Sequence, residues 1–221
     1  GSPYAPAELT FALILAAMRG IAHENAALRA GRWQTMLGRT VRGRTLGILG
    51  YGNIGKLVAH FGNTFGMEVV AFGREGSLQR AQADGIQTAA SQRELFAASD
   101  VASVHLRLVP DTRGIIGAED FAAMPSDALF VNTSRAELVA PGALAAGLAA
   151  QRPAMAAIDV YESEPTVSDP LIALPNVLAM PHIGYVERDS YELYLGTAFD
   201  NLVALAAGKP TGVVNPEVLK A

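Results

Sequence analysis

Short runs of apolar residues alternate with helical stretches between residues 43 and 185 of this 221-residue chain. The runs are 45–50, 68–72, 86–88, 101–105, 128–132, 154–158 and 177–179. Leu46–Leu49 and Ala128–Val131 show no alternation of polar and apolar residues, which is typical of strands that are buried on both faces. Strands that alternate with helices make right-handed βαβ crossovers, so we predict an α/β fold with a doubly wound parallel sheet.

The stretches between these runs predict the helices that cover the sheet. They are 53–65, 78–83, 92–97, 118–123 and 142–150. Residues 5–30, which are rich in Ala and Leu, are predicted to form one long helix, and a last helix is predicted from about 188 to 207, ahead of Gly208. These two flanking helices need further surfaces to pack on.

The composition excludes several classes of protein. Hydrophobic residues make up 50% of the chain and charged residues 17%, which excludes a disordered or fibrous chain. The net charge of −4 argues against binding to nucleic acid or an anionic membrane through bulk charge. The apolar stretch Leu9–Met18 is shorter than the ~20 residues of a membrane span, and residues 1–7 lack the basic start of a signal peptide.

The sequence contains no Cys, which excludes disulfides, Cys-ligated zinc and a thiol nucleophile. No cluster of His, Asp and Glu has the spacing of metal ligands, so we expect no metal site. The lack of Cys fits a reducing compartment, and we expect a cytoplasmic protein.

A glycine-rich turn joins the first run to the helix that follows it. Its sequence, Gly50-Tyr51-Gly52-Asn53-Ile54-Gly55, fits the pattern G-x-G-x-x-G. In that pattern Gly50 permits a tight turn, Gly52 lets the backbone approach a pyrophosphate, and Gly55 lets the helix pack closely on the strand. The N–H groups at the helix N-terminus favour the phosphates. The motif therefore predicts a dinucleotide-binding Rossmann unit; the alternative is an ordinary glycine-rich turn.

The second strand suggests which dinucleotide is bound. An NAD-preferring site would place Asp or Glu at its end, whereas this chain has Gly73 followed by Arg74. Because a guanidinium binds a 2′-phosphate and a carboxylate repels it, we favour NADP over NAD. Arg107, after the fourth strand, is a second candidate for the 2′-phosphate. Two alternatives stay open: Glu75 could support NAD, and both arginines could be surface charges.

Three later strand ends carry polar residues suited to hydride transfer. The carboxyl ends of parallel strands share one edge of the sheet, so Arg135, Glu164 and His182 are expected to meet there. Arg135 can bind the carboxylate and polarise the ketone of a 2-oxo acid, and His182 can exchange a proton with the ketone oxygen. Glu164 would orient the imidazole, although Glu162 competes for that role. Asp159 is expected near the nicotinamide, and His105 is expected to be structural.

These motifs resemble the D-isomer-specific 2-hydroxyacid dehydrogenases over nearly the whole chain, from Tyr4 to Pro216. The matching pieces are 49–55, 105–114, 132–135, 159–165 and 181–184. The resemblance implies an NAD(P)-dependent enzyme that resembles glyoxylate/hydroxypyruvate reductases, with Arg135, Glu164 and His182 as its catalytic residues. The cofactor contacts that we expect, from the motif and the resemblance together, are Gly50, Gly52, Asn53, Ile54, Gly55, Arg74, Leu106, Arg107, Thr112, Thr133, Ser134, Asp159 and Gly184.

The chain departs from the family pattern at Gly73, Arg107 and Ala136. Gly73 and Arg107 replace a ribose-binding Asp and a Pro of many members, and both changes favour NADP. Ala136 replaces the usual Gly after the catalytic Arg.

The resemblance also implies a division of the chain and a partner. We expect residues 3–208 to form the NAD(P)-binding domain and residues 209–221 to form a tail that returns to a separate substrate domain. The first long helix and the Gly31–Trp33 loop would form a homodimer interface. Because the substrate domain is missing from these 221 residues, we expect weak or no turnover. A non-catalytic dinucleotide-sensing or partner-binding module on the same fold is the alternative, whereas a formate-type dehydrogenase would carry Gln at position 164.

Overall fold

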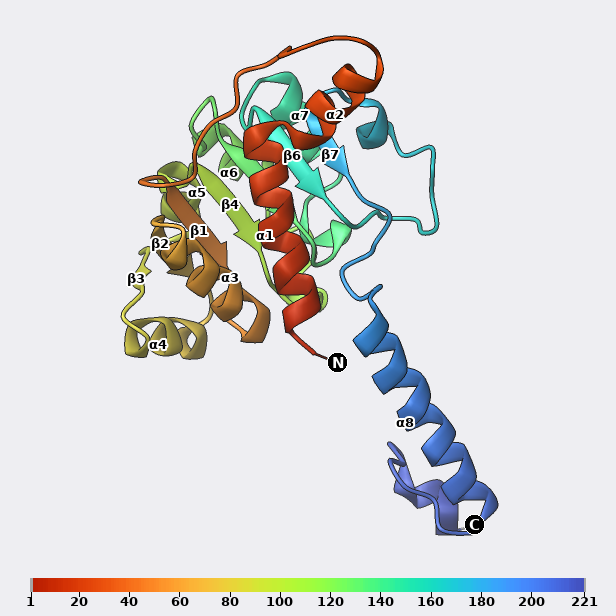
Figure 1. Cartoon of the computed structure of the whole chain (residues 1–221). Coiled ribbons are helices and arrows are strands. Elements are labelled where there is room, and N and C mark those ends of the chain that lie inside the picture. The colour runs from red at the N-terminus through yellow and green to blue at the C-terminus, as the bar shows by residue number, and fades with distance from the viewer. Residues whose placement is uncertain (1, 221) are drawn as a thin grey trace.

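All seven strands of the sheet run parallel, in the order β3-β2-β1-β4-β5-β6-β7 (Figure 1). This computed structural model describes residues 2–220. The strands are β1 Thr45–Leu49, β2 Glu68–Phe72, β3 Gln87–Thr88, β4 Val101–Val104, β5 Leu129–Asn132, β6 Met155–Ile158 and β7 Val177–Ala179. The predicted doubly wound parallel sheet is confirmed, and in it β2 and β4 flank β1.

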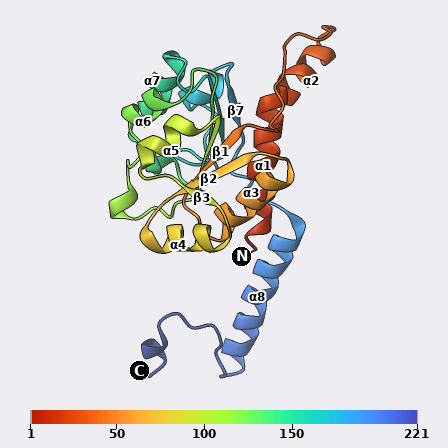
Figure 2. The ribbon, with the colours of Figure 1, turned by 90° about the vertical axis from the view of Figure 1, so that its left-hand side faces the viewer.

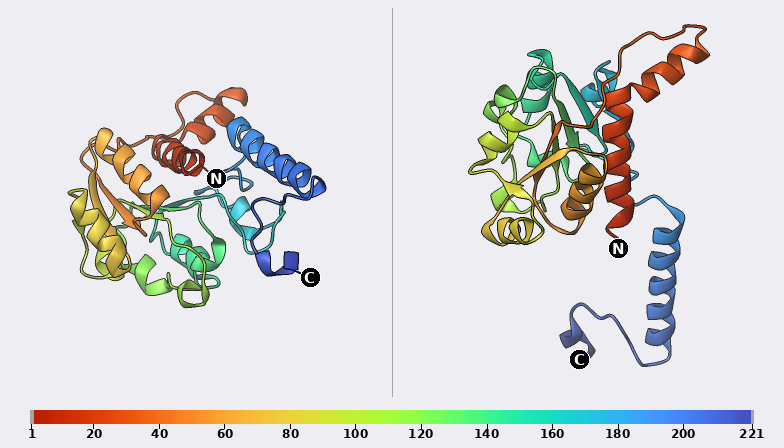
Figure 3. Two further views of the ribbon diagram at one scale, coloured as in Figure 1. Left: turned by 90° about the horizontal axis from the view of Figure 1, so that it is seen from below. Right: turned by 60° about the vertical axis from the view of Figure 1, so that its left-hand side comes forward.

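Helices cover both faces of this sheet. They are α1 Tyr4–Arg19, α2 Ile21–Arg29, α3 Asn53–Thr64, α4 Glu75–Ala83, α5 Gln92–Ala98, α6 Ala118–Ala123, α7 Ala143–Ala149 and α8 Arg188–Ala206. Seen from below, α1 and α3 lie on one face, and α5, α6 and α7 lie on the other (Figure 3). Short 3-10 turns at Pro110–Thr112, Ala136–Leu138, Pro170–Ala173 and Pro216–Lys220 complete the elements.

Side chains that alternate along the strands build two hydrophobic cores. Leu46 and Ile48 of β1 point to the core that contains α1 and α3, whereas Leu49 points to the core that contains α5, α6 and α7. In this second core, Phe121 and Phe130 pack edge to face with ring centroids 5.0 Å apart. Since both faces are covered, the strands show the continuous apolar sequence from which they were predicted.

The single long helix predicted over residues 5–30 is wrong. The chain forms two helices, which meet at a bend of 59°. Gly20 adopts the left-handed conformation with φ of +60° and ends α1, since its N–H bonds back to Ala17 and Ala16. α2 then extends away from the body of the molecule (Figures 2 and 3). An isolated Gly in a helical pattern is often tolerated, so the sequence alone did not reveal this break.

The last helix, α8, leaves the α/β body and extends into solvent (Figures 1 and 2). All of α8 is described, and Ser190 is its one buried residue. The division of the chain at residue 208 stays a prediction. Within residues 2–220 no single helix has the length and apolar character needed to cross a membrane, and α1 and α2 meet those criteria only as a bent pair.

The turn between β1 and α3 requires glycine at two positions. Gly50 has φ of +100°, and a Cβ atom there would lie 2.7 Å from the carbonyl oxygen of His105. A Cβ at Gly55 would lie 2.3 Å from the carbonyl oxygen of Gly50, so α3 contacts the end of β1 through bare backbone. Gly52 is different, because a Cβ there would meet nothing within 4 Å.

We therefore expect Gly55→Ala to lower the free energy of unfolding by about 2 kcal/mol or more, because the clash is with backbone that cannot rotate away. Gly52→Ala is the matched control and should cost about 1 kcal/mol or less. Urea unfolding of the two variants would measure this difference. Equal stability of the two variants would contradict the close contact between α3 and β1.

Candidate active site

The carboxyl ends of the strands carry two adjoining grooves. The outer groove has a volume of about 520 Å³, and the inner groove about 330 Å³. The outer groove is lined by Gly50, Gly52, Arg74, Gly76, Ser77, Arg80, His105, Leu106, Arg107, Val109 and Thr112. The inner groove is lined by Ile54, His105, Leu106, Arg107, Leu108, Thr133, Ser134 and Arg135. Because they share His105–Arg107, the grooves form one continuous path from Arg74 to Arg135.

The N-terminus of α3 opens beside the outer groove. The intrahelical hydrogen bonds begin where the Lys56 N–H donates to the Gly52 carbonyl, at 2.9 Å. The N–H groups of Asn53, Ile54 and Gly55 precede this bond, and no side chain of the described residues caps this helix end. The open space at Gly52 lets another molecule approach the backbone here. This end of α3 therefore fits the pyrophosphate of a dinucleotide.

Three arginines stand around the outer groove. Arg74 and Arg107 are exposed, and Arg74 lies 3.9 Å from Asp111 across the groove mouth. Arg80, which the sequence analysis missed, donates to the carbonyl oxygen of Tyr51 at 3.2 Å. Together these guanidiniums give the groove a positive charge that suits an additional phosphate.

Ser77 lies close to Gly73 and leaves little room for a side chain at position 73. The Ser77 hydroxyl is buried and accepts a hydrogen bond from the Tyr51 N–H at 2.8 Å. A Cβ at Gly73 would lie 3.1 Å from the Ser77 Cβ and Oγ atoms. An acidic residue at position 73 would therefore crowd Ser77, whose hydroxyl helps to hold the glycine-rich turn.

The segment after β4 forms the floor of both grooves. The Thr112 hydroxyl accepts from the Val109 N–H at 2.9 Å and donates to the Arg107 carbonyl at 2.7 Å, so it fixes the turn that presents Arg107. His105 hydrogen-bonds Ser103 at 2.9 Å. Burial lowers the pKa of His105 to about 3, so its imidazole is neutral at ordinary pH. This is consistent with the structural role that was predicted for it.

Asn132 shapes the loop that follows β5. Its side chain donates to the Arg135 carbonyl at 2.9 Å and accepts from the Ser134 N–H at 3.0 Å. The Ser134 hydroxyl donates to the Leu106 carbonyl at 2.6 Å and so joins this loop to the floor of the grooves. The exposed side chain of Arg135 lies at the end of the inner groove.

The structure brings Glu164 and His182 into direct contact. His182 Nδ1 lies 2.5 Å from Glu164 Oε2. An ionised carboxylate can only accept, so Nδ1 carries the shared proton and Nε2 is the nitrogen left for chemistry. Glu162, the competing candidate, instead lines a separate hollow with Asp169. The choice of Glu164 as the residue that orients His182 agrees with this geometry.

The segment after β6 holds the His182 loop in place. Both carboxylate oxygens of the buried Asp159 accept backbone N–H groups, from Ile183 at 2.8 Å and from Gly184 at 2.9 Å. The Tyr161 hydroxyl donates to the Met180 carbonyl at 2.9 Å. These bonds fix a turn in which His182 has φ of +53°, a conformation uncommon for residues other than Gly.

Two carboxyl groups at this edge have shifted pKa values. Partial burial raises the pKa of Glu164, but hydrogen bonds from His182 and the Tyr161 N–H, with the charges of His182 and Arg135, outweigh it and leave the pKa lowered. Burial raises the pKa of Asp159, and the bonds from Ile183 and Gly184 offset part of that shift.

The predicted residues fall into three groups in the structure. Most line the two grooves, and Arg135, Glu164 and His182 follow the neighbouring strands β5, β6 and β7. Asp159 and Gly184 are buried behind His182, so their predicted contact with a cofactor stays a prediction. The sequence analysis missed Thr10, Ser77 and Arg80, which belong to no motif, and it gave no role to Asn132, which lies in the matching piece 132–135. Among residues 2–220, no three His, Asp or Glu side chains are grouped to hold a metal ion.

Comparisons with known proteins agree on one family. Residues 11–184 match the profile described as D-isomer specific 2-hydroxyacid dehydrogenase, NAD binding domain. A glyoxylate reductase of Aeropyrum pernix is 39% identical over 98% of this chain and 68% of its own length. The crystal structure of phosphoglycerate oxidoreductase from Vibrio cholerae is 52% identical, with a TM-score of 0.91, over 94% of this chain and 68% of that one.

A second similar structure contains a bound cofactor. An acyclic imino acid reductase (Bsp5), in complex with NADPH and D-Arg, is 29% identical with a TM-score of 0.79, over 95% of this chain and 67% of that one. This chain thus spans about two thirds of the length of each of these three proteins.

The lowered pKa of Glu164 predicts how stability depends on pH. The folded state favours the ionised carboxylate, so this contribution is present above the ordinary pKa of 4.5 and is lost as the pH falls through the lowered value. Glu164→Gln should therefore flatten the acid limb of the free energy of unfolding by about 1 kcal/mol or less. Urea unfolding between about pH 3 and pH 6 would measure it. Glu162→Gln is the control, and the same flattening in both variants would contradict the assignment.

Proposed function

Since the chain belongs to the D-isomer-specific 2-hydroxyacid dehydrogenase family and corresponds to its NAD-binding domain, we propose that it binds a nicotinamide dinucleotide and takes part in hydride transfer between that cofactor and a 2-oxo or 2-hydroxy acid. The cofactor supplies the hydride chemistry when bound, and the protein positions the reactants and moves the proton. Among the proteins above, the relative from Aeropyrum pernix is named for the reduction of glyoxylate, which is a 2-oxo acid.

The single observation that carries this proposal is the bond between His182 Nδ1 and Glu164 Oε2, at the same edge of the sheet as the two grooves. It leaves Nε2 as the atom that donates a proton to the ketone oxygen, or accepts one from the hydroxyl in the reverse direction. Arg135 follows β5, which pairs with β6, the strand that precedes Glu164, and its guanidinium suits the substrate carboxylate and the polarised ketone. A 2-oxo acid presents a carboxylate and a ketone on adjacent carbons, so one small molecule satisfies both residues.

NADP is the cofactor that we favour over NAD. Three guanidiniums surround the outer groove, and a side chain at position 73 would crowd Ser77, since its Cβ would lie 3.1 Å from the Ser77 Cβ and Oγ atoms. Both features suit a 2′-phosphate, and the second disfavours a carboxylate that would bind a free ribose. The structure of Bsp5, which contains NADPH, shows that a similar protein accepts the phosphorylated cofactor.

Titration of the 221-residue chain with NADPH and NADH tests this function. We expect NADPH to bind more tightly, and Arg74→Ala to weaken NADPH binding by roughly tenfold with little change for NADH, because the lost interaction is with the 2′-phosphate. Arg113→Ala, which removes an exposed arginine outside both grooves, is the control. Calorimetry showing no binding of either dinucleotide would refute the proposed function, and tighter binding of NADH would refute the cofactor preference.

The same protein tests the chemical step. Arg135 is exposed and His182 is half-buried, so the site is open to water and we expect only slow oxidation of NADPH when glyoxylate is added. His182→Gln should abolish this reaction and leave NADPH affinity unchanged. If NADPH is oxidised equally fast by the variant, His182 is not the acid/base.

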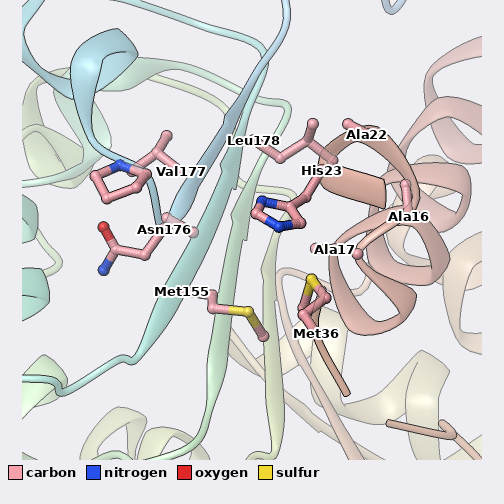
Figure 4. Close-up of a pocket in the computed structure, with 12 residues that line it drawn as sticks. Ala16, Ala17, Ala22, His23, Met36, Met155, Asn176, Val177 and Leu178 are labelled. Carbon is pink, nitrogen blue, oxygen red and sulfur yellow. The ribbon is translucent and has the colours of Figure 1, made fainter. Parts of the chain in front are cut away.

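We also propose that the chain forms a homodimer through α1, α2 and the loop that follows them. Trp33 is 75% exposed and Leu37 96% exposed on this projecting segment. A hollow lined by apolar residues lies at its base, where His23 of α2 faces Met155 of β6 and Leu178 of β7 (Figure 4). Apolar side chains on a projecting arm and an apolar hollow beside it suit an interface between two copies.

Light scattering of the purified chain tests the dimer. We expect about twice the chain mass of 23.1 kDa for the unchanged protein, and 23.1 kDa for the double variant Trp33→Glu with Leu37→Glu, since the charges would be buried in the interface. Val167→Glu places the same charge on an exposed apolar residue of another loop and should leave the dimer intact. A monomeric unchanged protein would contradict the proposal.

A further inference from the structure

A buried hydroxyl on α1 lies behind the inner groove and contacts one of the residues that line it. Thr10 has no exposed surface, and its Oγ1 atom lies 2.7 Å from the Oγ1 atom of Thr133. The two residues are 123 positions apart in the sequence. Thr133 lines the inner groove, between the N-terminus of α3 and Arg135, so Thr10 contacts a groove residue without reaching the groove itself.

The direction of this hydrogen bond follows from a count of protons. Thr10 Oγ1 also lies 2.7 Å from the carbonyl oxygen of Pro6, which can only accept. A threonine hydroxyl has one proton, and Thr10 donates that proton to the carbonyl oxygen of Pro6. The proton between Thr10 and Thr133 therefore comes from Thr133, so a ligand that reaches Thr133 Oγ1 from the groove would meet only lone pairs.

An oxygen that can only accept selects its ligand. It binds an N–H or O–H group and is poorly matched to an ester or ketone oxygen or a methyl group. In a nicotinamide dinucleotide, the carboxamide of the ring supplies an NH₂ donor. The carboxylate of the substrate cannot fill this role, because it too can only accept.

We propose that Thr10 is a positioning residue, which fixes the Thr133 hydroxyl as an acceptor so that the groove takes the nicotinamide ring by its amide NH₂. This inference rests on the proposed binding of a nicotinamide dinucleotide. The hydrogen bond from the amide NH₂ to Thr133 would hold the ring in one orientation about its bond to the ribose. A groove lined only by apolar and arginine side chains would not specify that orientation.

The packing of α1 keeps Thr10 in place. Pro6 and Leu9, on the same turns of α1, lie beside Gly184: a Cβ at Gly184 would be 3.6 Å from Pro6 and 3.8 Å from Leu9. The first turns of α1 therefore contact both the Thr133 loop and the loop of His182. Without the Thr10 hydroxyl, the Thr133 proton would lose its partner and could turn toward the groove.

The test compares two cofactors that differ at the amide. In the 3-acetylpyridine analogue a methyl group replaces the NH₂, so the ratio of its dissociation constant to that of the nicotinamide form reports the amide contact. We expect the unchanged chain to favour the nicotinamide form, and Thr10→Val, which keeps the shape of the side chain, to reduce this preference by roughly fivefold. Thr10→Ser keeps the hydroxyl and should retain the preference.

A dinucleotide fragment without the ring separates this role from general damage. ADP-ribose, with a 2′-phosphate if NADP is the cofactor bound, should have the same affinity for all three proteins. The inference is overturned if the unchanged chain does not discriminate between the two rings, if Thr10→Val keeps the full preference, or if that variant loses ADP-ribose binding in the same proportion.

Two further results keep the test decisive. If Thr10→Val does not fold, Thr133→Val replaces it, because this half-buried residue is the proposed acceptor and its loss should remove the same preference. If neither nicotinamide dinucleotide binds to the unchanged chain, the proposed function itself fails. Tight binding of the dinucleotides without discrimination between the two rings would refute only the proposed role of Thr10 and leave the proposed function standing.

Discussion

The contact between Gly55 and the carbonyl oxygen of Gly50 is the constraint on which the rest of the molecule depends. It allows a fully buried strand to pass into a half-buried helix within a single short turn, with no side chain between them. The first N–H groups of α3 consequently open at the edge where the other strands also end. Any residue larger than Gly at position 55 would push α3 away from β1, and the groove would lose its phosphate-binding wall.

Hydrogen bonds fix the loops that carry the candidate site. Asn132 and Ser134 fix the loop of Arg135, while Asp159 and Tyr161 fix the loop of His182. No buried side-chain nitrogen or oxygen within the described chain lacks a partner. Buried polar networks stabilise one arrangement when every member is satisfied. The side chains of the candidate site thus belong to loops, and hydrogen bonds from residues at the strand ends hold those loops in one conformation.

The sequence allowed the sheet and its functional edge to be predicted because both depend on local patterns. Apolar runs and the glycine motif lie within short segments, and parallel strands must end at one edge, which brought Glu164 and His182 together correctly. Thr10, Ser77 and Arg80 could not be found in this way, because their roles depend on contacts with residues 26 to 123 positions away. The break at Gly20 was missed for a different reason, because the φ angle of one residue does not change the pattern of apolar residues.

The link between Thr10 and Thr133 also has a consequence for biosynthesis. α1 leaves the ribosome well before β5 and β6, and translation of the intervening 123 residues takes roughly ten seconds. Phe11 can pack on Phe61 of α3 and on Phe65, which follows α3, in that interval, but the side of α1 that meets β5 and β6 remains uncovered until those strands emerge. The nascent polypeptide therefore exposes the apolar face of α1 until its later half emerges, and exposed apolar surface of this kind is what chaperones protect in general.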